Sequence, residues 1–259
     1  MFYLICFIIL LILAVLNIQL QDKLSRQLLS VLAAIILICI AGLRYETGGD
    51  WDTYTILFNS FPPLSRLLGN PSELIDMRVE EGFVLLSALI KSLGGNVQHL
   101  FFVVTTINIL LITYALPKYT KYPVVALMCY YGILYFNLEM IYIRQATAVA
   151  MCFFAIQFIK SKKIVWYMLI IVLACTFHRV AALMIPLYFI LDRQFSVWLH
   201  LAIVGVGAIV MIIGIPWIQS IFVTIAGWLG ENYADKAQMY TENALFAVDR
   251  GFSVGFLLN

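Results

Sequence analysis

The sequence predicts an all-α, polytopic integral membrane protein. Hydrophobic residues make up 63% of its 259 residues and charged residues 12%, whereas soluble domains carry about 25% charge. Apolar runs that approach the roughly 20 residues needed to cross a bilayer recur along the chain. These two observations exclude a soluble globular domain, and the net charge of +2 excludes a basic nucleic-acid surface.

We expect about eight to ten membrane helices in one transmembrane domain covering residues 1–259. The first run lacks a basic n-region and a small-residue cleavage site, so it is a span and not a removable signal peptide. Two further stretches, 82–93 and 216–229, are shorter, and the last residues open like one more span, so we expect the natural chain to continue. The candidate spans are 2–17, 28–43, 97–116, 123–138, 142–159, 164–177, 180–191 and 197–214.

Orientation follows from four short loops that hold lysine or arginine, at Lys23, Lys118, Lys160 and Arg193. Cytoplasmic loops are enriched in these residues. All four face the cytoplasm if 82–93 forms an interfacial or re-entrant helix that does not cross. Residues 44–96 then form an outer, periplasmic loop, and 231–250 form an outer polar segment. The stretch 164–191 is either two short spans or one long span, which would place its central histidine in mid-membrane.

The sharpest break in the apolar pattern is RYETGGDWDTY at 44–54. Arg44 is either an interface anchor or a clamp for phosphate oxygens, which suit the planar fork of a guanidinium. The glycines that follow permit a close backbone approach. Asp50 stands among the aromatic rings of Tyr45, Trp51 and Tyr54, a pairing that suits sugar hydroxyls and flat pyranose faces. A calcium loop is less favoured because DWD lacks the regular oxygen spacing.

Two more polar groups flank later apolar runs. Glu80 and Glu81 are either a solvated helix start or carboxylates of which one, with a raised pKa, acts as a general base. Arg144 opens the 142–159 span, and an arginine in a membrane helix is costly enough to mark function by default. The alternative is a structural ion pair or hydrogen bond with Glu139 or Gln145, which are near in sequence.

His178 and Arg179 lie between two apolar stretches in ACTFHRVAALMIP. A lone histidine is often structural, but beside an arginine it is also a candidate acid or base. The five cysteines sit in apolar runs without metal-like spacing. The chain has no P-loop, no HExxH, no Cys/His set and no DxD, so we expect neither metal nor cofactor. GFSVG at 251–255 matches GxSxG by letters only, without strand–turn–helix context.

Four motifs, GLRYETGGDWDTY, EEGFVLLSALIKSLGGN, IRQATA and FHRVAALMIP, resemble the EpsG-type branch of the Wzy-like polysaccharide polymerases over residues 30–190. The resemblance implies a GT-C-like fold and a glycosyltransferase of the bacterial inner membrane. Such enzymes polymerise undecaprenyl-pyrophosphate-linked oligosaccharides at the periplasmic face, without a metal, into O-antigen, capsule or exopolysaccharide. Their partners are the lipid-linked oligosaccharides, the bilayer and a chain-length regulator, and no nucleic acid.

The resemblance also implies roles for the polar residues. Arginines bind the pyrophosphate, a carboxylate or histidine orients or deprotonates the acceptor hydroxyl, and neighbouring side chains bind substrate. Residues 231–250 are a candidate for the late outer loop of related enzymes. The pyrophosphate ligands are Arg44, Arg144 and Arg179; the catalytic candidates are Asp50, Glu81 and His178; the other substrate-binding candidates are Tyr45, Trp51, Tyr54, Glu80 and Gln145.

Three other functions stay open. A multi-span transporter or flippase should show internal repeats or helices broken at mid-membrane, and no clear repeat is present. A membrane-bound acyltransferase should place a histidine with an asparagine or aspartate in an acyl tunnel. An intramembrane serine protease would rest on Ser253 and His178. What separates these functions is whether the outer-face arginines meet in one pocket at headgroup depth.

Overall fold

The computed structural model describes residues 1–77, 79–191 and 193–213, with Thr224 and Gly227. These residues contain helices and connections but no strand. The chain divides into two compact units, 1–193 and 194–259, and the described helix of the second unit is α14 (Val197–Ile213). The predicted outer segment 231–250, Ser253 and all but two residues of 216–229 lie outside the described residues.

Five helical segments of the described chain are long and apolar enough to cross a membrane. Each lies where the sequence predicts a span, which confirms the all-α, polytopic class. Three shorter apolar helical segments cover the other predicted spans. The long segments are α1 (Phe2–Gln19), α2 (Lys23–Gly42), α7 with η1 (Val97–Lys118), α8 with η2 and α9 (Pro123–Met140), and α10 with α11 (Ile143–Lys160).

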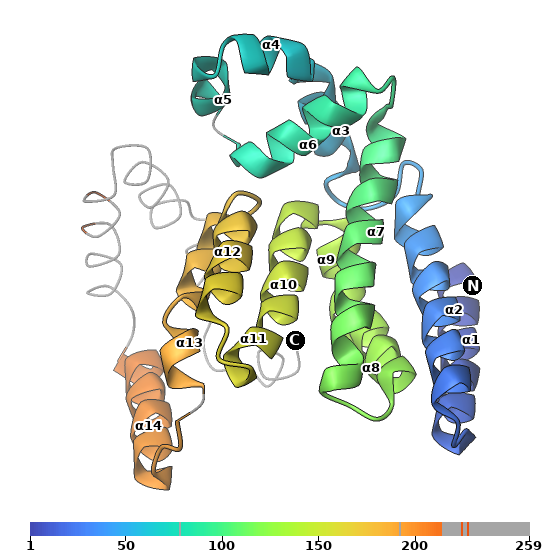
Figure 1. The fold of residues 1–259 in the computed structure, drawn as a ribbon, viewed down its shortest axis with the longest axis vertical. Coiled ribbons are helices and arrows are strands. Elements are labelled where there is room, and N and C mark those ends of the chain that lie inside the picture. Colours follow the sequence, from blue (N-terminus) through green and yellow to red (C-terminus); the bar gives the residue numbers. More distant parts are fainter. Residues whose placement is uncertain (78, 192, 214–223, 225–226, 228–259) are drawn as a thin grey trace. The chain divides into compact units, whose positions relative to one another are not determined.

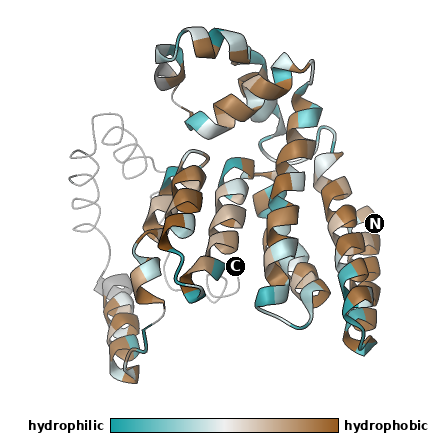
Figure 2. Cartoon of the chain, in the orientation of Figure 1, coloured by the Kyte–Doolittle hydropathy of each residue, from teal (hydrophilic) through white to brown (hydrophobic). Residues whose placement is uncertain are grey.

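The helix α7 is central to the first unit (Figure 1). It packs against α2 on one side and α10 on the other, α10 packs against α12 (Ile164–Cys175), and α1 packs against α8 (Pro123–Tyr130). Large apolar side chains are exposed along α1, α2, α7 and α12, and hydrophobic residues predominate on these helices (Figure 2). A helix that is apolar all round suits a lipid environment.

The stretch 164–191 forms two antiparallel segments and not one long helix. After α12 the chain turns at 176–178, and η3 (Arg179–Met184) packs back against α12, followed by α13 (Leu187–Ile190). The hydroxyl of Tyr167 donates a hydrogen bond to the Met184 carbonyl at 2.6 Å, which ties the two segments together. His178 therefore lies at the turn of this hairpin.

The predicted outer loop 44–96 folds into a cap of four short helices at one end of α7 and α10 (Figure 1). The helix predicted at 82–93 is α6, and it packs against α4, α5 and α7. Lys91 Nζ donates to the carbonyl oxygens of Phe58, Asn59 and Phe61 at 3.3, 2.9 and 2.6 Å, which joins α6 to the end of α3. The cap helices are α3 (Trp51–Ser60), α4 (Leu64–Gly69), α5 (Ser72–Asp76) and α6 (Glu81–Ser92).

The basic loops lie at the opposite end of the first unit. The α1–α2, α7–α8 and α11–α12 connections are found there (Figure 1). Arg26 donates to the Lys121 carbonyl at 3.5 Å, and its Cζ lies 5.4 Å from the centroid of the Tyr122 ring. Lys118 hydrogen-bonds to Gln157, which joins the α7–α8 connection to α11 (Gln157–Lys160). The basic connections therefore lie at one end of the first unit, and the cap lies at the other end.

Candidate active site

The site begins with a close contact between the cap and the α12–η3 hairpin. The Gly82 amide, in the first turn of α6, donates a hydrogen bond to the Thr176 carbonyl at 2.8 Å. A Cβ at position 82 would lie 2.3 Å from Thr176 Oγ1 and 2.9 Å from that carbonyl oxygen. Only glycine permits this approach. The contact brings the two glutamates that precede Gly82 next to the His–Arg pair that follows Thr176.

One carboxylate, Glu80, holds both an arginine and the histidine. Its Oε2 pairs with Arg144 Nη1, and its Oε1 lies 3.5 Å from His178 Nδ1. The three side chains are half-buried, with exposed fractions of 16% for Glu80, 32% for Arg144 and 31% for His178. Partial burial strengthens their interaction and leaves the guanidinium and imidazole open on one side.

A second ion pair lies beside the first. Glu81 Oε1 lies 3.1 Å from Arg179 Nη2, and both side chains are more exposed than those of the first pair. The cap therefore supplies two carboxylates, and the hairpin supplies a histidine and an arginine. With Arg144 from the start of α10, three separate stretches of sequence meet at one end of the helices.

Tyr54, in the cap helix α3, lies next to Arg144. Its ring is buried, and its hydroxyl lies close to the Arg144 guanidinium. Burial raises the pKa of Tyr54, while the charge of Arg144 opposes that rise. Asp50, one turn earlier at the start of α3, is close enough to Tyr54 to raise the same pKa further. Tyr54 thus lies beside the Arg144–Glu80 pair, and Asp50 lies near Tyr54.

Arg44 lies inside the protein and not on the exposed side of this cluster. It is buried, its Nη1 donates to the Glu139 carbonyl at 2.9 Å, and its Cζ lies 4.3 Å from the centroid of the Phe101 ring. Its Nε and Nη2 are buried and have no hydrogen-bond partner among the described residues. Burial lowers the pKa of Arg44 to about 10, so the guanidinium keeps its charge at neutral pH.

The remaining predicted residues lie either near Arg44 or near the cluster of ion pairs. The Trp51 and Tyr45 rings meet edge to face at 5.6 Å, with Tyr45 exposed and Trp51 packed towards Phe101. Gln145 is exposed at the start of α10, and it lines a cavity together with His178. The structure therefore brings Arg144, Arg179, His178, Glu80 and Glu81 to one place. Tyr54 and Gln145 adjoin them, and Asp50 lies near Tyr54. Arg44 is buried against Phe101, which Trp51 also contacts, and Tyr45 packs on Trp51.

A model of the EpsG family matches residues 27–258. The chain belongs to the EpsG family. Membership suggests a role in polysaccharide polymerisation and fits a multi-pass membrane protein. No curated protein and no solved structure matches this EpsG family chain.

In this EpsG family member, Glu139 is not the partner of Arg144, although it is near in sequence. Its carboxylate is buried and accepts hydrogen bonds from the Tyr130 hydroxyl at 2.8 Å and from Asn108 Nδ2 at 3.0 Å. The chain breaks between α9 (Phe136–Met140) and α10, so the two side chains diverge. The partner of Arg144 is Glu80, 64 residues away.

Two glycine contacts position the site; the sequence indicated a close backbone approach at Gly48 but not its partner, and it did not indicate the contact of Gly82. The pairing of Gly82 with Thr176 is long-range, and the only local signal was a glycine directly after two carboxylates at a helix start. Gly48 has a φ of +105°, and a Cβ there would lie 2.3 Å from the Met140 carbonyl oxygen. This close approach holds the 44–50 loop of the EpsG family chain against the break between α9 and α10.

Proposed function

We propose that this EpsG family member polymerises oligosaccharide repeat units carried on undecaprenyl pyrophosphate, at the periplasmic or outer face of the bacterial plasma membrane. The observation that carries the proposal is the cluster of Arg144, Arg179, His178, Glu80 and Glu81 at the cap end of the helices. It contains cations suited to a pyrophosphate and groups able to move a proton. Family membership supports the same chemistry.

Orientation is part of the proposal. Lysine- and arginine-rich loops of membrane proteins face the cytoplasm, and the basic connections of the first unit lie at the end opposite the cap. The cluster then opens to the outer face. Lipid-linked repeat units would present their pyrophosphate at the depth of the lipid headgroups. The half-buried arginines would lie at the same depth.

The transfer reaction breaks the bond between the anomeric carbon of the donor glycan and the pyrophosphate oxygen. The electron pair leaves with the pyrophosphate, whose developing charge Arg144 and Arg179 stabilise. A hydroxyl oxygen of the acceptor forms the new bond to the anomeric carbon. A base of the site takes the hydroxyl proton, and the candidates are His178, Glu81 and Asp50.

The geometry of Glu80 favours His178 among these bases. Arg144 can exchange Glu80 for a phosphate oxygen when substrate binds, because both are anionic acceptors for the same guanidinium. Glu80 then remains beside His178 Nδ1 and orients the ring, which leaves Nε2 to accept the proton. Tyr54 holds Arg144 during this exchange. Arg44 acts indirectly by fixing the wall of the site.

The proposal is tested by a gel profile of surface polysaccharide from a deletion strain. The strain is complemented with wild type, Arg144→Ala, Arg144→Lys or the control Arg66→Ala, and membrane abundance is measured in parallel. Arg66 is an exposed cap arginine paired with Glu73 outside the cluster. We expect wild type and Arg66→Ala to restore the ladder, Arg144→Ala to leave single repeat units, and Arg144→Lys to restore it partly. An unchanged ladder in the deletion strain would favour a transporter or an acyltransferase.

A further inference from the structure

A lateral cavity begins directly beside the polar cluster. It lies between α10 and η3 and has a volume of about 420 Å³, within the range of small-molecule sites. Gln145 and His178 are the polar residues of its lining, and apolar side chains form the rest. The apolar lining comes from Ala148, Val149, Cys152 and Phe153 on α10, from Ile156 directly after it, and from Val180, Ala181, Leu183 and Met184 on η3.

The cavity follows one face of α10 away from the cluster. Gln145, Ala148, Cys152 and Ile156 recur at helical spacing. At 1.5 Å per residue, the face from Gln145 to Ile156 is about 16 Å long. One end of the cavity is therefore polar and shared with the Glu80 cluster through His178, and the other end is apolar and lies within a membrane-spanning segment.

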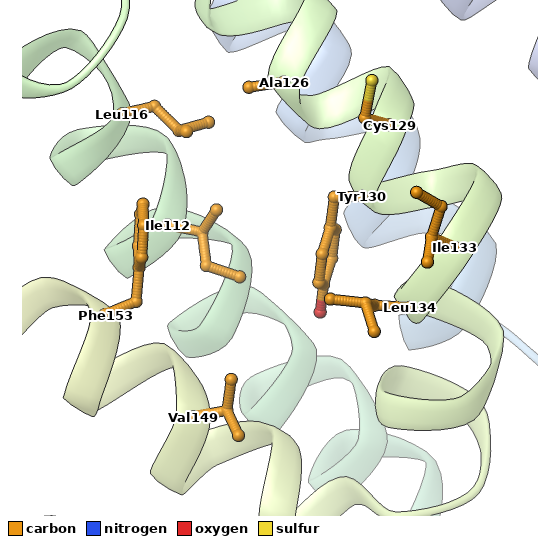
Figure 3. Close-up of a pocket in the computed structure, with 9 residues that line it drawn as sticks. All are labelled: Ile112, Leu116, Ala126, Cys129, Tyr130, Ile133, Leu134, Val149 and Phe153. Carbon is orange, nitrogen blue, oxygen red and sulfur yellow. The ribbon is translucent and has the colours of Figure 1, made fainter. Parts of the chain in front are cut away.

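A second apolar cavity of about 300 Å³ adjoins the first. The two share Val149 and Phe153, and the second lies between α7, α10 and the Pro123–Met140 segment (Figure 3). Apolar side chains that line the two cavities are themselves exposed, among them Ile133, Val149 and Leu183. A chain that enters at His178 has a continuous apolar surface to follow along α10.

We propose that the cavity between α10 and η3 binds the polyprenyl chain of the lipid-pyrophosphate substrate, with the pyrophosphate at Arg144 and Arg179, beside His178. This inference rests on the proposed function. It commits to the prenyl chain because His178 belongs to both the cavity and the charged cluster, so one ligand with an anionic head and an apolar tail fits both. A phospholipid acyl chain is the competing occupant.

The surrounding bilayer limits how much such a groove can add to the binding affinity. Transfer of a prenyl chain from lipid to an apolar groove gains little, because lipid tails are as apolar as the lining. The charged cluster therefore supplies most of the affinity, and the groove supplies position and selectivity. A bulky side chain within the groove should discriminate between long and short prenyl chains more than it abolishes binding.

The first experiment places a photoreactive phenylalanine at Leu183, which lines the groove, or at Leu169, an exposed control on α12 outside it. The full chain in nanodiscs is irradiated with radiolabelled undecaprenyl pyrophosphate. We expect labelling at 183 about tenfold above 169, reduced by unlabelled undecaprenyl pyrophosphate and not by phosphatidylglycerol. Equal labelling at both positions, or equal competition by phosphatidylglycerol, would overturn the inference.

The second experiment narrows the groove with Cys152→Phe and uses Cys6→Phe, an equally buried cysteine on α1 outside the groove, as the matched control. We expect Cys152→Phe to raise KM about tenfold for a repeat unit on the full-length prenyl carrier, and to leave KM for a geranyl-linked analogue unchanged. Equal losses for both carriers would contradict the groove. Selective labelling at 183 without any polymerisation would refute the proposed function and support the prenyl-binding groove. Polymerisation with unselective labelling would support the proposed function and refute the groove.

Discussion

Glu80 contacts both Arg144 at the start of α10 and His178 in the α12–η3 hairpin. The substitution Glu80→Gln tests the importance of these two contacts. The substitution keeps the shape of the side chain and removes the charge that Arg144 and His178 share. Breaking a fully buried ion pair costs about 3–5 kcal/mol. Because Arg144 is 32% exposed, water can solvate the freed guanidinium, and we expect a loss of about 1–2 kcal/mol in the free energy of unfolding.

The kinetic effect of Glu80→Gln should be larger than its effect on folding. Without the negative charge of Glu80, the positive charge that forms on His178 when it takes the proton is no longer stabilised, so kcat should fall about 10- to 100-fold. KM should stay the same or fall, because the freed Arg144 is fully available to the pyrophosphate. The assay is polymerisation of lipid-linked repeat units by purified protein, with kcat and KM separated and Glu73→Gln as the control carboxylate in the cap. A raised KM with unchanged kcat would refute the reasoning, since it would mean that Glu80 binds substrate directly.

Three further substitutions test the framework of the site. Gly82→Ala should lower polymerisation at least about tenfold because its Cβ meets Thr176, whereas Gly69→Ala, which has nothing within 4 Å of its Cβ, should not; equal effects would refute the contact. Lys91→Met should speed proteolysis of the cap, seen as nicking between α3 and α6, because three carbonyl oxygens lose their donor; an unchanged digestion pattern would argue against that bracing role. Glu139→Leu should lower the unfolding temperature by leaving Tyr130 and Asn108 unpaired, a cost of about 1–3 kcal/mol for each buried group, and Glu139→Gln should lower it less; the opposite order in a thermal melt would contradict this.

The sequence was sufficient to predict the spans, because membrane helices are specified locally by apolar runs and charged loops. Arg144 and His178 were also identifiable, since a charge in or beside an apolar run carries a cost that function can explain. The partners of these residues were not. Glu139 is five residues from Arg144, yet the break before α10 separates their side chains.

Burial of Arg44 was equally hidden from sequence. An arginine at the end of a span fits an exposed anchor, an anion clamp or an interior residue, and only the packing of Phe101 and the Glu139 carbonyl around it decides. The cluster itself depends on the contact between Gly82 and Thr176, which are far apart in the sequence. Such contacts depend on tertiary packing, which hydropathy does not encode.

The most direct measurement uses purified protein in nanodiscs with one synthetic lipid-linked repeat unit as the only substrate. The account predicts products of two or more repeat units with release of undecaprenyl pyrophosphate, near-complete loss of these products in Arg144→Ala, and partial recovery in Arg144→Lys. If the purified wild-type protein lengthens no glycan, or if Arg144→Ala lengthens it as fast as wild type, the Arg144, Glu80 and His178 cluster is not the site of glycosyl transfer.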